Sequence, residues 1–501
     1  MTRIAYLASA LGLVLSTAAC RSDDDPPGGP DGGGGSDGPP VAGEVTIQEV
    51  QNDAMASGTA IELKGVVVVA IDAFGNRTGD LFVSEPEGGP FSGVKVFGAS
   101  LDQIATLQPG DLVDITGAKK HEGCNMESPC GTVVFSDGHS ITEVMPVSQG
   151  SMQITKVGTG TVPTPTVVDA KAIAALPSRT ERDAEWEKYE GVLIKVTNAR
   201  QLSEVATFGR DPGPDSNEFR ATGFARVQSV LTELPNTAVA GTCYDSITGV
   251  GDYFFNYIVA PRTAADLVTG GTGCNPMVES VVALQTATAI PEIAKLTNVI
   301  VTARDDVGGA KGFWVQDAAQ GAANNGVYVF IGGSNSSPAT LNPALVVGAR
   351  VDIVGGVDEY DFAPQGQTAT GDTVTQLANP LISNIVAPTA QPTPATTASV
   401  ATLASIGAAG EPWEGVLVQV GPVKVTAITM NFGQVTFTDN NGNSIIMDDE
   451  AQRFGGTGEP PVPTMGSCYN VTGVMHVQVN ADIRTINPRG AADIVATTGC
   501  N

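Results

Sequence analysis

Short apolar runs with a period of two recur along the chain after residue 44. Runs of five to eight residues rich in Val, Ile, Phe and Thr are separated by turns of Gly, Asn, Asp and Pro. This alternation predicts β-strands that place one face on a core. Weak helical spacing is confined to short Ala-rich segments such as residues 168–176 and 400–406. We therefore expect an all-β protein with a few short helices.

The strand pattern occurs twice in the sequence. Residues 186–274 match residues 413–500: WEKYEGVLI is answered by WEGVLV, both copies carry Cys-Tyr and then Thr-Gly-Val, and both close on Thr-Gly-Cys. The preceding segments also correspond, because GVVVVAID, GVKVF and PGDLVDITG of residues 65–117 match NVIVTARD, GVYVF and VGARVDIVG of residues 298–355. The order A, B, A′, B′ is a tandem duplication of a two-domain unit.

Each domain has a strand count typical of a small closed barrel. Five or six strands and one short helix fit an OB-like barrel, whereas an immunoglobulin-like sandwich, the alternative, needs about seven strands and no helix. We expect four OB-like barrels after a signal peptide and a disordered tether. The predicted ranges are 1–19 (signal peptide), 20–43 (lipidated cysteine and tether), 44–150 (A), 151–275 (B), 276–386 (A′) and 387–501 (B′).

Several stretches resemble the OB-fold-like modules that accompany secreted bacterial nucleases. These are FWVQD at 313–317, GVYVF at 326–330, GARVDIVG at 348–355 and the WEKYEGVLI stretch at 186–194. The resemblance covers most of the chain after residue 44 and implies the barrel fold. A nuclease domain would need several hundred further residues, so the resemblance implies the accessory modules alone.

The N-terminus predicts export and a lipid anchor. Arg3 precedes an apolar run over residues 4–15, which is too short to span a bilayer, and small residues lead to Cys20. This pattern resembles a bacterial lipobox, in which the cysteine is lipidated; an ordinary signal peptide that contains a cysteine is the alternative. Because Arg21 follows Cys20, we expect an outer-membrane lipoprotein that faces the cell surface or the periplasm. Residues 21–43 lack apolar periodicity and predict a solvated tether.

The other six cysteines fall into pairs. We expect disulfides between Cys124 and Cys130, Cys243 and Cys274, and Cys468 and Cys500. The last two pairs are separated by 31 and 32 residues at corresponding places of the repeat. Exported compartments permit such bonds. Zinc is the alternative, but CxxC is absent and the three histidines are scattered.

The charge balance changes the list of partners. The chain has 53 acidic and 26 basic residues, a formal net charge of −27. Such a surface repels phosphates, which makes nucleic acid and anionic lipid unfavourable electrostatic partners. The basic run Lys119-Lys120-His121 is too short for a nucleic-acid patch, and we expect it to be solvated.

The best metal candidate lies at residues 439–450. Asp439, Asn441, Asn443 and Glu450 occupy positions 1, 3, 5 and 12 of a calcium loop, but Ser444 replaces the glycine at position 6. The flanks alternate like two strands around an Asn-Gly turn, so a plain hairpin is the favoured interpretation. Calcium on other acidic loops, such as residues 358–361, is a further alternative. Otherwise we expect no cofactor.

An OB barrel that binds nucleic acid needs aromatic platforms beside cations. The candidates are Tyr253, Phe255, Tyr257, Arg262 and Trp314. The alternative is that alternate members of this set are core residues.

These patterns favour a non-catalytic surface lipoprotein that binds or scaffolds a protein or glycan of the envelope or its surroundings. Few histidines and no recognisable catalytic constellation disfavour an enzyme. The alternative is an accessory single-stranded nucleic-acid-binding protein that works with a separate nuclease, assisted by calcium.

Overall fold

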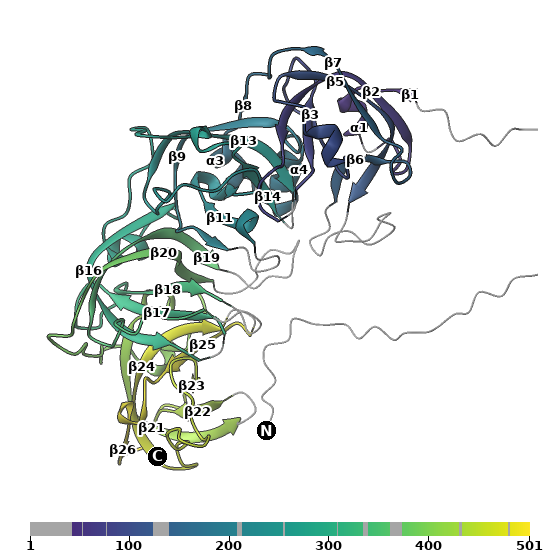
Figure 1. Cartoon of the computed structure of the whole chain (residues 1–501). Coiled ribbons are helices and arrows are strands. Elements are labelled where there is room, and N and C mark those ends of the chain that lie inside the picture. Colours follow the sequence, from purple (N-terminus) through teal and green to yellow (C-terminus); the bar gives the residue numbers. More distant parts are fainter. Residues whose placement is uncertain are drawn as a thin grey trace, which may run out of the picture. The chain divides into compact units, whose positions relative to one another are not determined.

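The computed structural model describes residues 43–52, 54–76, 78–123, 140–207, 213–253, 256–307, 309–333, 339–360, 373–429, 433–478 and 481–500. The signal peptide, Cys20, the tether, the Cys124–Cys130 pair and Phe255 lie outside these residues. The described chain is all-β and consists of OB-like barrels with short helices (Figure 1).

Domain A is a closed barrel of five strands. Its strand order is 1-2-3-5-4, and strand 4 pairs back onto strand 1. Strands 3 and 5 run parallel while the other barrel pairs are antiparallel. This is the Greek-key strand order of OB folds. In chain order the strands are β2 (Ala60–Ile71), β3 (Leu81–Ser84), β4 (Gly93–Val96), β5 (Asp111–Gly123) and β6 (Ile141–Pro146).

Domains A′ and B′ repeat this topology and also close. In A′ the strands are β16 (Ile293–Asp305), β17 (Lys311–Gln316), β18 (Gly326–Gly332), β19 (Arg350–Tyr360) and β20 (Val374–Val386). In B′ they are β21 (Leu417–Thr429), β22 (Gln434–Thr438), β23 (Ser444–Met447), β24 (Cys468–Gln478) and β25 (Ile483–Asn487), with β26 (Ile494–Thr497) added beside β24.

Domain B keeps the order but is less closed. Its first and second strands are joined by the single bridge between Gln201 and Ala221. The five strands are β9 (Leu193–Arg200), β11 (Asn217–Arg220), β12 (Arg226–Gln228), β13 (Cys243–Tyr253) and β14 (Tyr257–Ala260). Short additions are β8 (Thr166–Val167), β10 (Ala206–Thr207) and β15 (Leu267–Thr269).

One boundary differs from the sequence expectation. Strand β7 (Gln153–Thr159) falls in the range predicted for domain B, but it pairs with β5 of domain A. Met152 and Ile154 accordingly belong to the core of A. Domain A therefore extends about ten residues past residue 150. At its other end, β1 (Gly43–Glu44) pairs with β2.

A short helix precedes the first strand of every barrel. The four helices are α1 (Ile47–Val50), α3 (Ala170–Ala174), α5 (Val281–Gln285) and α6 (Val400–Leu403). Each begins after a Thr, Asp or Ser whose side chain accepts a hydrogen bond from the backbone three residues on, which stabilises so short a helix. The first and fourth residues of each helix are buried in the barrel core. The remaining helices are α2 (Leu101–Ile104) and α4 (Arg179–Glu187).

Two of the predicted disulfides are present. Cys243 bonds to Cys274 and Cys468 to Cys500, so the same site is cross-linked in B and in B′. This confirms the pairing expected from the repeat. Among the described residues, none of the helices has the length and apolar character needed to cross a bilayer.

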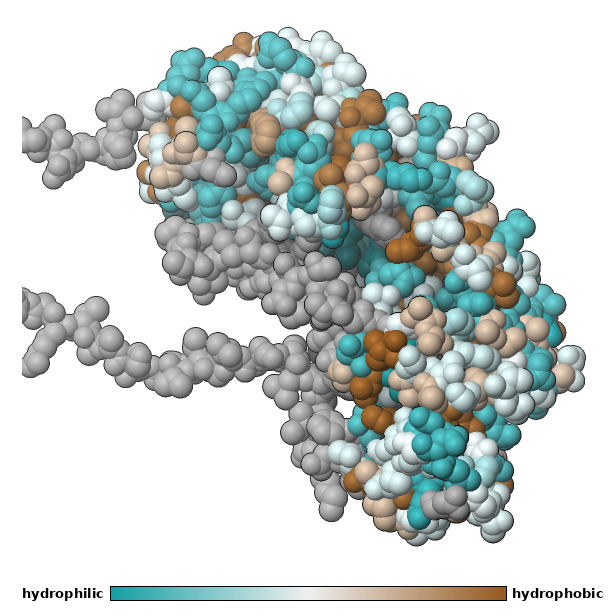
Figure 2. Space-filling view, turned by 180° about the vertical axis from the view of Figure 1, so that it is seen from behind, coloured by the Kyte–Doolittle hydropathy of each residue, from teal (hydrophilic) through white to brown (hydrophobic). Residues whose placement is uncertain are grey.

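Apolar residues on the surface are dispersed. Figure 2 shows brown hydrophobic residues in separate groups among teal hydrophilic ones. Scattered exposure of this kind is normal for a folded domain.

Candidate functional site at the junction of A′ and B′

Each A barrel meets the following B barrel at a pair of glycines. A Cβ atom on Gly93, at the start of β4, would lie 2.1 Å from the carbonyl oxygen of Gly191. At the second junction a Cβ on Gly326 would lie 2.2 Å from the carbonyl carbon of Gly415. Real Cβ atoms do not come this close to backbone, so only glycine permits the approach. The two junctions therefore have the same backbone frame.

A buried carboxylate precedes the second glycine of each pair. One oxygen of Glu190 accepts the Thr142 N–H at 2.7 Å, and one oxygen of Glu414 accepts the Thr375 N–H at 2.8 Å. The second oxygen of each carboxylate is buried without a hydrogen-bond partner among the described residues. Burial raises the pKa of both carboxyl groups well above the ordinary value, and neighbouring Glu187 or Glu411 raises it further.

A glutamine from the barrel's first helix completes the frame. The side-chain N–H of Gln51 donates to the carbonyl of Gly93 at 2.7 Å, and that of Gln285 donates to Gly326 at the same distance. The Trp-Glu-x-Tyr-Glu-Gly stretch is therefore a joint between barrels. It also shifts the expected register of the repeat: Glu190 corresponds to Glu414, so Tyr189 rather than Trp186 corresponds to Trp413.

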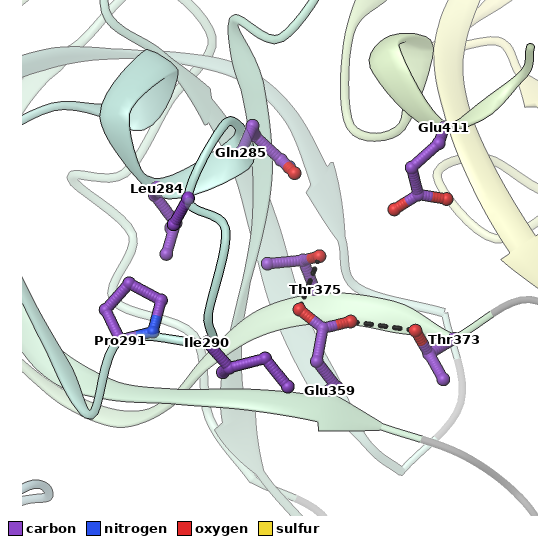
Figure 3. A pocket seen from close by; sticks show the side chains of 9 residues that line it. Leu284, Gln285, Ile290, Pro291, Glu359, Thr373, Thr375 and Glu411 are labelled. Atoms are coloured by element: carbon purple, nitrogen blue, oxygen red, sulfur yellow. Dashed lines mark hydrogen bonds between the residues drawn. The ribbon is translucent and has the colours of Figure 1, made fainter. Parts of the chain in front are cut away.

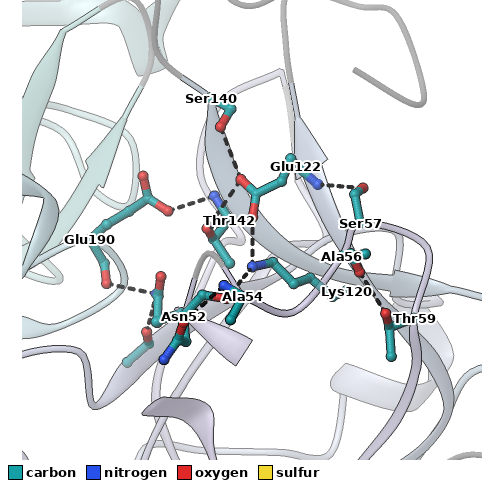
Figure 4. A network of polar contacts seen from close by, with 12 residues as sticks. Asn52, Ala54, Ala56, Ser57, Thr59, Lys120, Glu122, Ser140, Thr142 and Glu190 are labelled. Carbon is teal, nitrogen blue, oxygen red and sulfur yellow. Dashed lines mark hydrogen bonds and ion pairs between the residues drawn. The ribbon is translucent and has the colours of Figure 1, made fainter. Parts of the chain in front are cut away.

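Lys120 lies in a buried polar network beside the first joint (Figure 4). Its ammonium is 3.0 Å from Glu122 Oε1 and donates to the carbonyl of Asn52 at 3.0 Å. Glu122 also accepts from Ser140 Oγ at 2.9 Å and from Thr142 Oγ1 at 3.1 Å. Lys120 is only 1% exposed. The expectation of a solvated basic run is wrong for this residue, because β5 points it inward toward carboxylate and carbonyl oxygens.

Domain A′ has the same carboxylate but not the lysine. Glu359 accepts from Thr373 Oγ1 and from Thr375 Oγ1, each at 2.8 Å. In the strand register Glu359 lies opposite Thr375, just as Glu122 lies opposite Thr142. Two residues earlier, on the same face of the strand, A has Lys120 and A′ has Val357.

A pocket of about 440 Å³ opens beside Glu359 (Figure 3). One side is apolar, with Leu284, Ile290 and Pro291, and the carboxylates of Glu359 and Glu411 lie across from it. The volume is within the usual range for ligand sites, about 300 to 1,000 Å³. The remaining lining residues are Gln285, Ala287, Thr373 and Thr375.

The electrostatics of this pocket favour a cation. Burial raises the pKa of Glu359, the two threonine hydroxyls oppose that shift, and the nearby Glu411 charge adds to it. Glu411 is ion-paired with Arg484 at 2.5 Å, whose side chain is 1% exposed. Among the described residues no cation pairs with Glu359. The pocket therefore combines an apolar wall with a carboxylate that a positive group would stabilise.

The centres of the two joints are filled differently. In A–B the ammonium of Lys95 lies 3.2 Å from Asp80 and 3.4 Å from Asp252. In A′–B′, Tyr328 takes the place of Lys95 and His476 takes the place of Asp252. Their ring centroids lie 5.3 Å apart. The Tyr328 hydroxyl donates to Asp305 at 2.6 Å. Burial lowers the pKa of His476 to about 4.

The residues predicted to stack on bases are placed mostly in the interior. Trp314 is fully buried at the A′–B′ joint, in a cluster with Leu417 and Val474 of B′. Tyr253 is 2% exposed and packs edge-on against Tyr257 with centroids 4.9 Å apart. The structure thus corrects the expectation of an exposed platform for Tyr253 and Trp314, because B′ covers Trp314 and Tyr253 packs beside Tyr257 of its own barrel. Phe255 lies outside the described residues.

Tyr257 and Arg262 also have structural partners. The Tyr257 hydroxyl donates to Glu187 at 2.5 Å. Arg262 binds both carboxylate oxygens of Asp266, four residues on. The pair Arg489 and Asp493 repeats this clamp in B′. The repeated Pro-Arg-x-Ala-Ala-Asp sequence is therefore explained by a local turn rather than by a binding face.

The calcium-loop residues are not brought together. Asp439 accepts the backbone N–H groups of Asn441 and Asn443 within a turn that joins β22 and β23. Glu450 comes after β23, beyond the opposite end of that hairpin, and lies 3.5 Å from His476. The plain hairpin is what forms, because strand pairing carries position 12 away from position 1. Nowhere in the described ranges do three His, Cys, Asp or Glu side chains form a metal-binding group.

The comparisons with known proteins leave the family open. No protein-family model matches the chain, and no curated protein matches it. Among solved structures, the tetrameric p202 HIN2 is similar with 12% sequence identity and a TM-score of 0.20, over 38% of this chain and 93% of that chain. A TM-score this low carries no argument about fold or function.

Proposed function

We propose that this protein is a non-catalytic, lipid-anchored binding or scaffolding protein of the bacterial cell envelope, with a protein or glycan as its ligand. The observation that carries the proposal is the position of the side chains that could act as acids, bases or nucleophiles. Glu190, Glu414 and Asp252 lie buried, and Lys95 and His476 lie partly buried, at the joints between barrels. Such groups fix neighbouring barrels against each other, as a scaffold requires.

The anchor and location are part of the same proposal. Lipidation at Cys20 would hold the barrels at the outer membrane by the tether of residues 21–43. The two disulfides support an exported protein, since such bonds persist in oxidising compartments.

The test uses the chain from Arg21, which retains every described residue. Immobilised protein is incubated with envelope polysaccharides and with envelope proteins, and both the retained and the released material are sized. We expect a specific ligand to be retained and recovered intact. Reproducible shortening of any polymer would overturn the non-catalytic part, and no retention from either fraction would overturn the binding part.

The nucleic-acid alternative is tested by titrating the same chain with single-stranded DNA at low salt, with and without millimolar calcium. Salt-sensitive binding would favour it, because counterion release makes phosphate binding fall as salt rises. The burial of Tyr253 and Trp314 supports the expectation of no binding in either condition.

A further inference from the structure

We propose that the pocket beside Glu359 binds a primary alkylammonium group, specifically the lysine side chain of a protein ligand. The proposal rests on the proposed binding function and names the chemistry of its ligand. The pocket would hold that ammonium where the first copy holds its own Lys120.

Glu359 in A′ occupies the position that Glu122 occupies in A. Glu122 and Glu359 lie opposite corresponding threonines, and each accepts hydrogen bonds from two hydroxyl side chains. In A, this arrangement already binds a lysine ammonium at 3.0 Å. The chain therefore contains, in its first copy, the same kind of complex that we infer for A′.

The side chain of Val357 is shorter than that of Lys120. A valine side chain ends three bonds short of where a lysine ammonium would lie, and it packs into the barrel core. Two residues further along β19, Glu359 lines a pocket of about 440 Å³ together with Thr375. In A the same side of the barrel is filled by the Lys120 network (Figure 4).

The lining of the pocket suits a lysine side chain. A lysine side chain has an apolar stem and a charged tip. Leu284, Pro291 and Ile290, which is 60% exposed at the rim, offer an apolar wall for the stem. The carboxylates of Glu359 and Glu411 lie across from that wall (Figure 3). The acidic net charge of the protein would attract a cationic ligand over a longer range.

The experiment measures binding of small probes to the chain from Arg21 by ligand-observed NMR. The probes are Nα-acetyl-lysine amide, its uncharged isostere Nα-acetyl-norleucine amide, a short peptide with one central lysine, and 1,5-diaminopentane. We expect the lysine amide to bind at least about tenfold more tightly than the norleucine amide, since a charge-assisted hydrogen bond is lost in the latter.

Two variants locate the site. Val357→Lys installs the residue that A has, so its ammonium should occupy the pocket and abolish probe binding. Val357→Met is the matched control, because it adds length without charge and should keep most of the binding. Glu359→Gln removes the charge, while its amide oxygen can accept from one threonine hydroxyl and its amide N–H can donate to the other, and it should weaken lysine-amide binding about tenfold or more. A thermal melt of each variant verifies that it is folded.

The outcomes separate the possible results. Equal binding of the lysine and norleucine amides, or full binding by folded Val357→Lys, would overturn the site. Tighter binding of 1,5-diaminopentane than of the lysine peptide would overturn the protein source and assign the pocket to a free amine. If the immobilised chain retains an envelope ligand but the lysine amide does not bind, this inference fails while the proposed function stands.

Discussion

The A–B and A′–B′ joints share a frame and differ in what fills it. Both have two facing glycines, a buried glutamate on a threonine N–H and a glutamine on a glycine carbonyl. The centre of the first is an ion pair of Lys95 with Asp80 and Asp252, whereas the second has Tyr328 against His476. The close contact between the two glycine backbones therefore fixes the joint, whereas the side chains inside the joint can differ.

The same difference extends to the barrel rim. The first copy neutralises its carboxylate with Lys120, whereas the second has Val357 at that position and a pocket beside Glu359. Once a duplicated frame is secured by other contacts, one copy can lose an internal cation without losing its fold. The second copy then exposes a carboxylate to an outside ligand.

The largest expected effect comes from breaking the shared frame. Gly93→Ala and Gly326→Ala would each place a methyl group about 2.1 to 2.2 Å from backbone atoms of the next barrel. We expect each to lower the free energy of opening of its joint by at least about 4 kcal/mol, the range of the most damaging substitutions. Native-state hydrogen exchange of β4 and β18 measures this locally.

Gly490→Ala is the control for these variants. Gly490 has an extended backbone, and no atom lies within 4 Å of the point where an added methyl group would sit, so the change should stay within about 0.5 kcal/mol. A loss below about 1 kcal/mol in both joint variants would show that the glycine contact does not define the frame.

The two joints should also differ in how their stability depends on pH, and this effect is of intermediate size. Burial depresses the pKa of His476 to about 4 from an ordinary 6.5, so its contribution to stability is present above pH 6.5 and is lost as pH falls toward 4. Between pH 7 and pH 5 the A′–B′ joint should lose about 2 kcal/mol through this group. Glu450 faces the imidazole, and burial raises its pKa well above the ordinary value.

His476→Gln should flatten this part of the pH dependence, measured as the difference in urea unfolding between pH 7 and pH 5. Gly490→Ala, which changes no titratable group, is the control and should leave the difference as in the parent chain. An unchanged pH dependence in His476→Gln would mean that folding does not shift the pKa of the imidazole.

The smallest effect concerns the carboxyl groups of the frame. Because burial raises the pKa of Glu190 and Glu414, the stability that each contributes is present below pH 4.5 and declines as pH rises. Replacing either by Gln keeps an acceptor for the threonine N–H and removes this decline. At pH 8 each variant should be more stable than the parent chain, and near pH 4 the gain should vanish.

The gain should be larger for Glu190→Gln than for Glu414→Gln. Arg484 lowers the pKa of Glu414 and partly offsets its burial, whereas the charges beside Glu190 are Glu187, Asp252 and Glu122. Urea titrations of both variants at pH 4 and pH 8 measure this. Equal gains would show that the Arg484 charge does not lower the pKa of Glu414.

The barrels, their duplication and two of the disulfides could be predicted from the sequence. Alternation predicts strands from neighbouring residues, and the repeat is visible when two segments are compared. The sequence was not sufficient for the joints. Gln51 and Glu190 meet across 139 residues, and nothing in their neighbourhoods distinguishes a buried glutamate from a solvated one. The usable signal was the repetition of Glu-Gly at 190–191 and 414–415 together with Gly93 and Gly326.

The aromatic residues show a different limit. Period-2 alternation states that Tyr253 and Trp314 share a face with their second neighbours, but it does not state which face a neighbouring barrel covers. Contact with B′ buries Trp314, whereas Tyr253 is buried beside Tyr257 of its own barrel. Similarly, Lys120 follows Lys119 in a run that looks solvated, and only the strand register shows that it points inward.

The short connection between the two halves has a consequence for proteolysis. Cys274 is cross-linked to Cys243, Asn275 accepts from the Arg200 guanidinium at 3.0 Å, and Val278 is bonded on both sides to the strand that starts A′. A protease cuts where backbone is exposed and free of hydrogen bonds. The boundary between the duplicated halves is therefore a poor cleavage site, and the two halves should stay joined there when the protein is treated with protease.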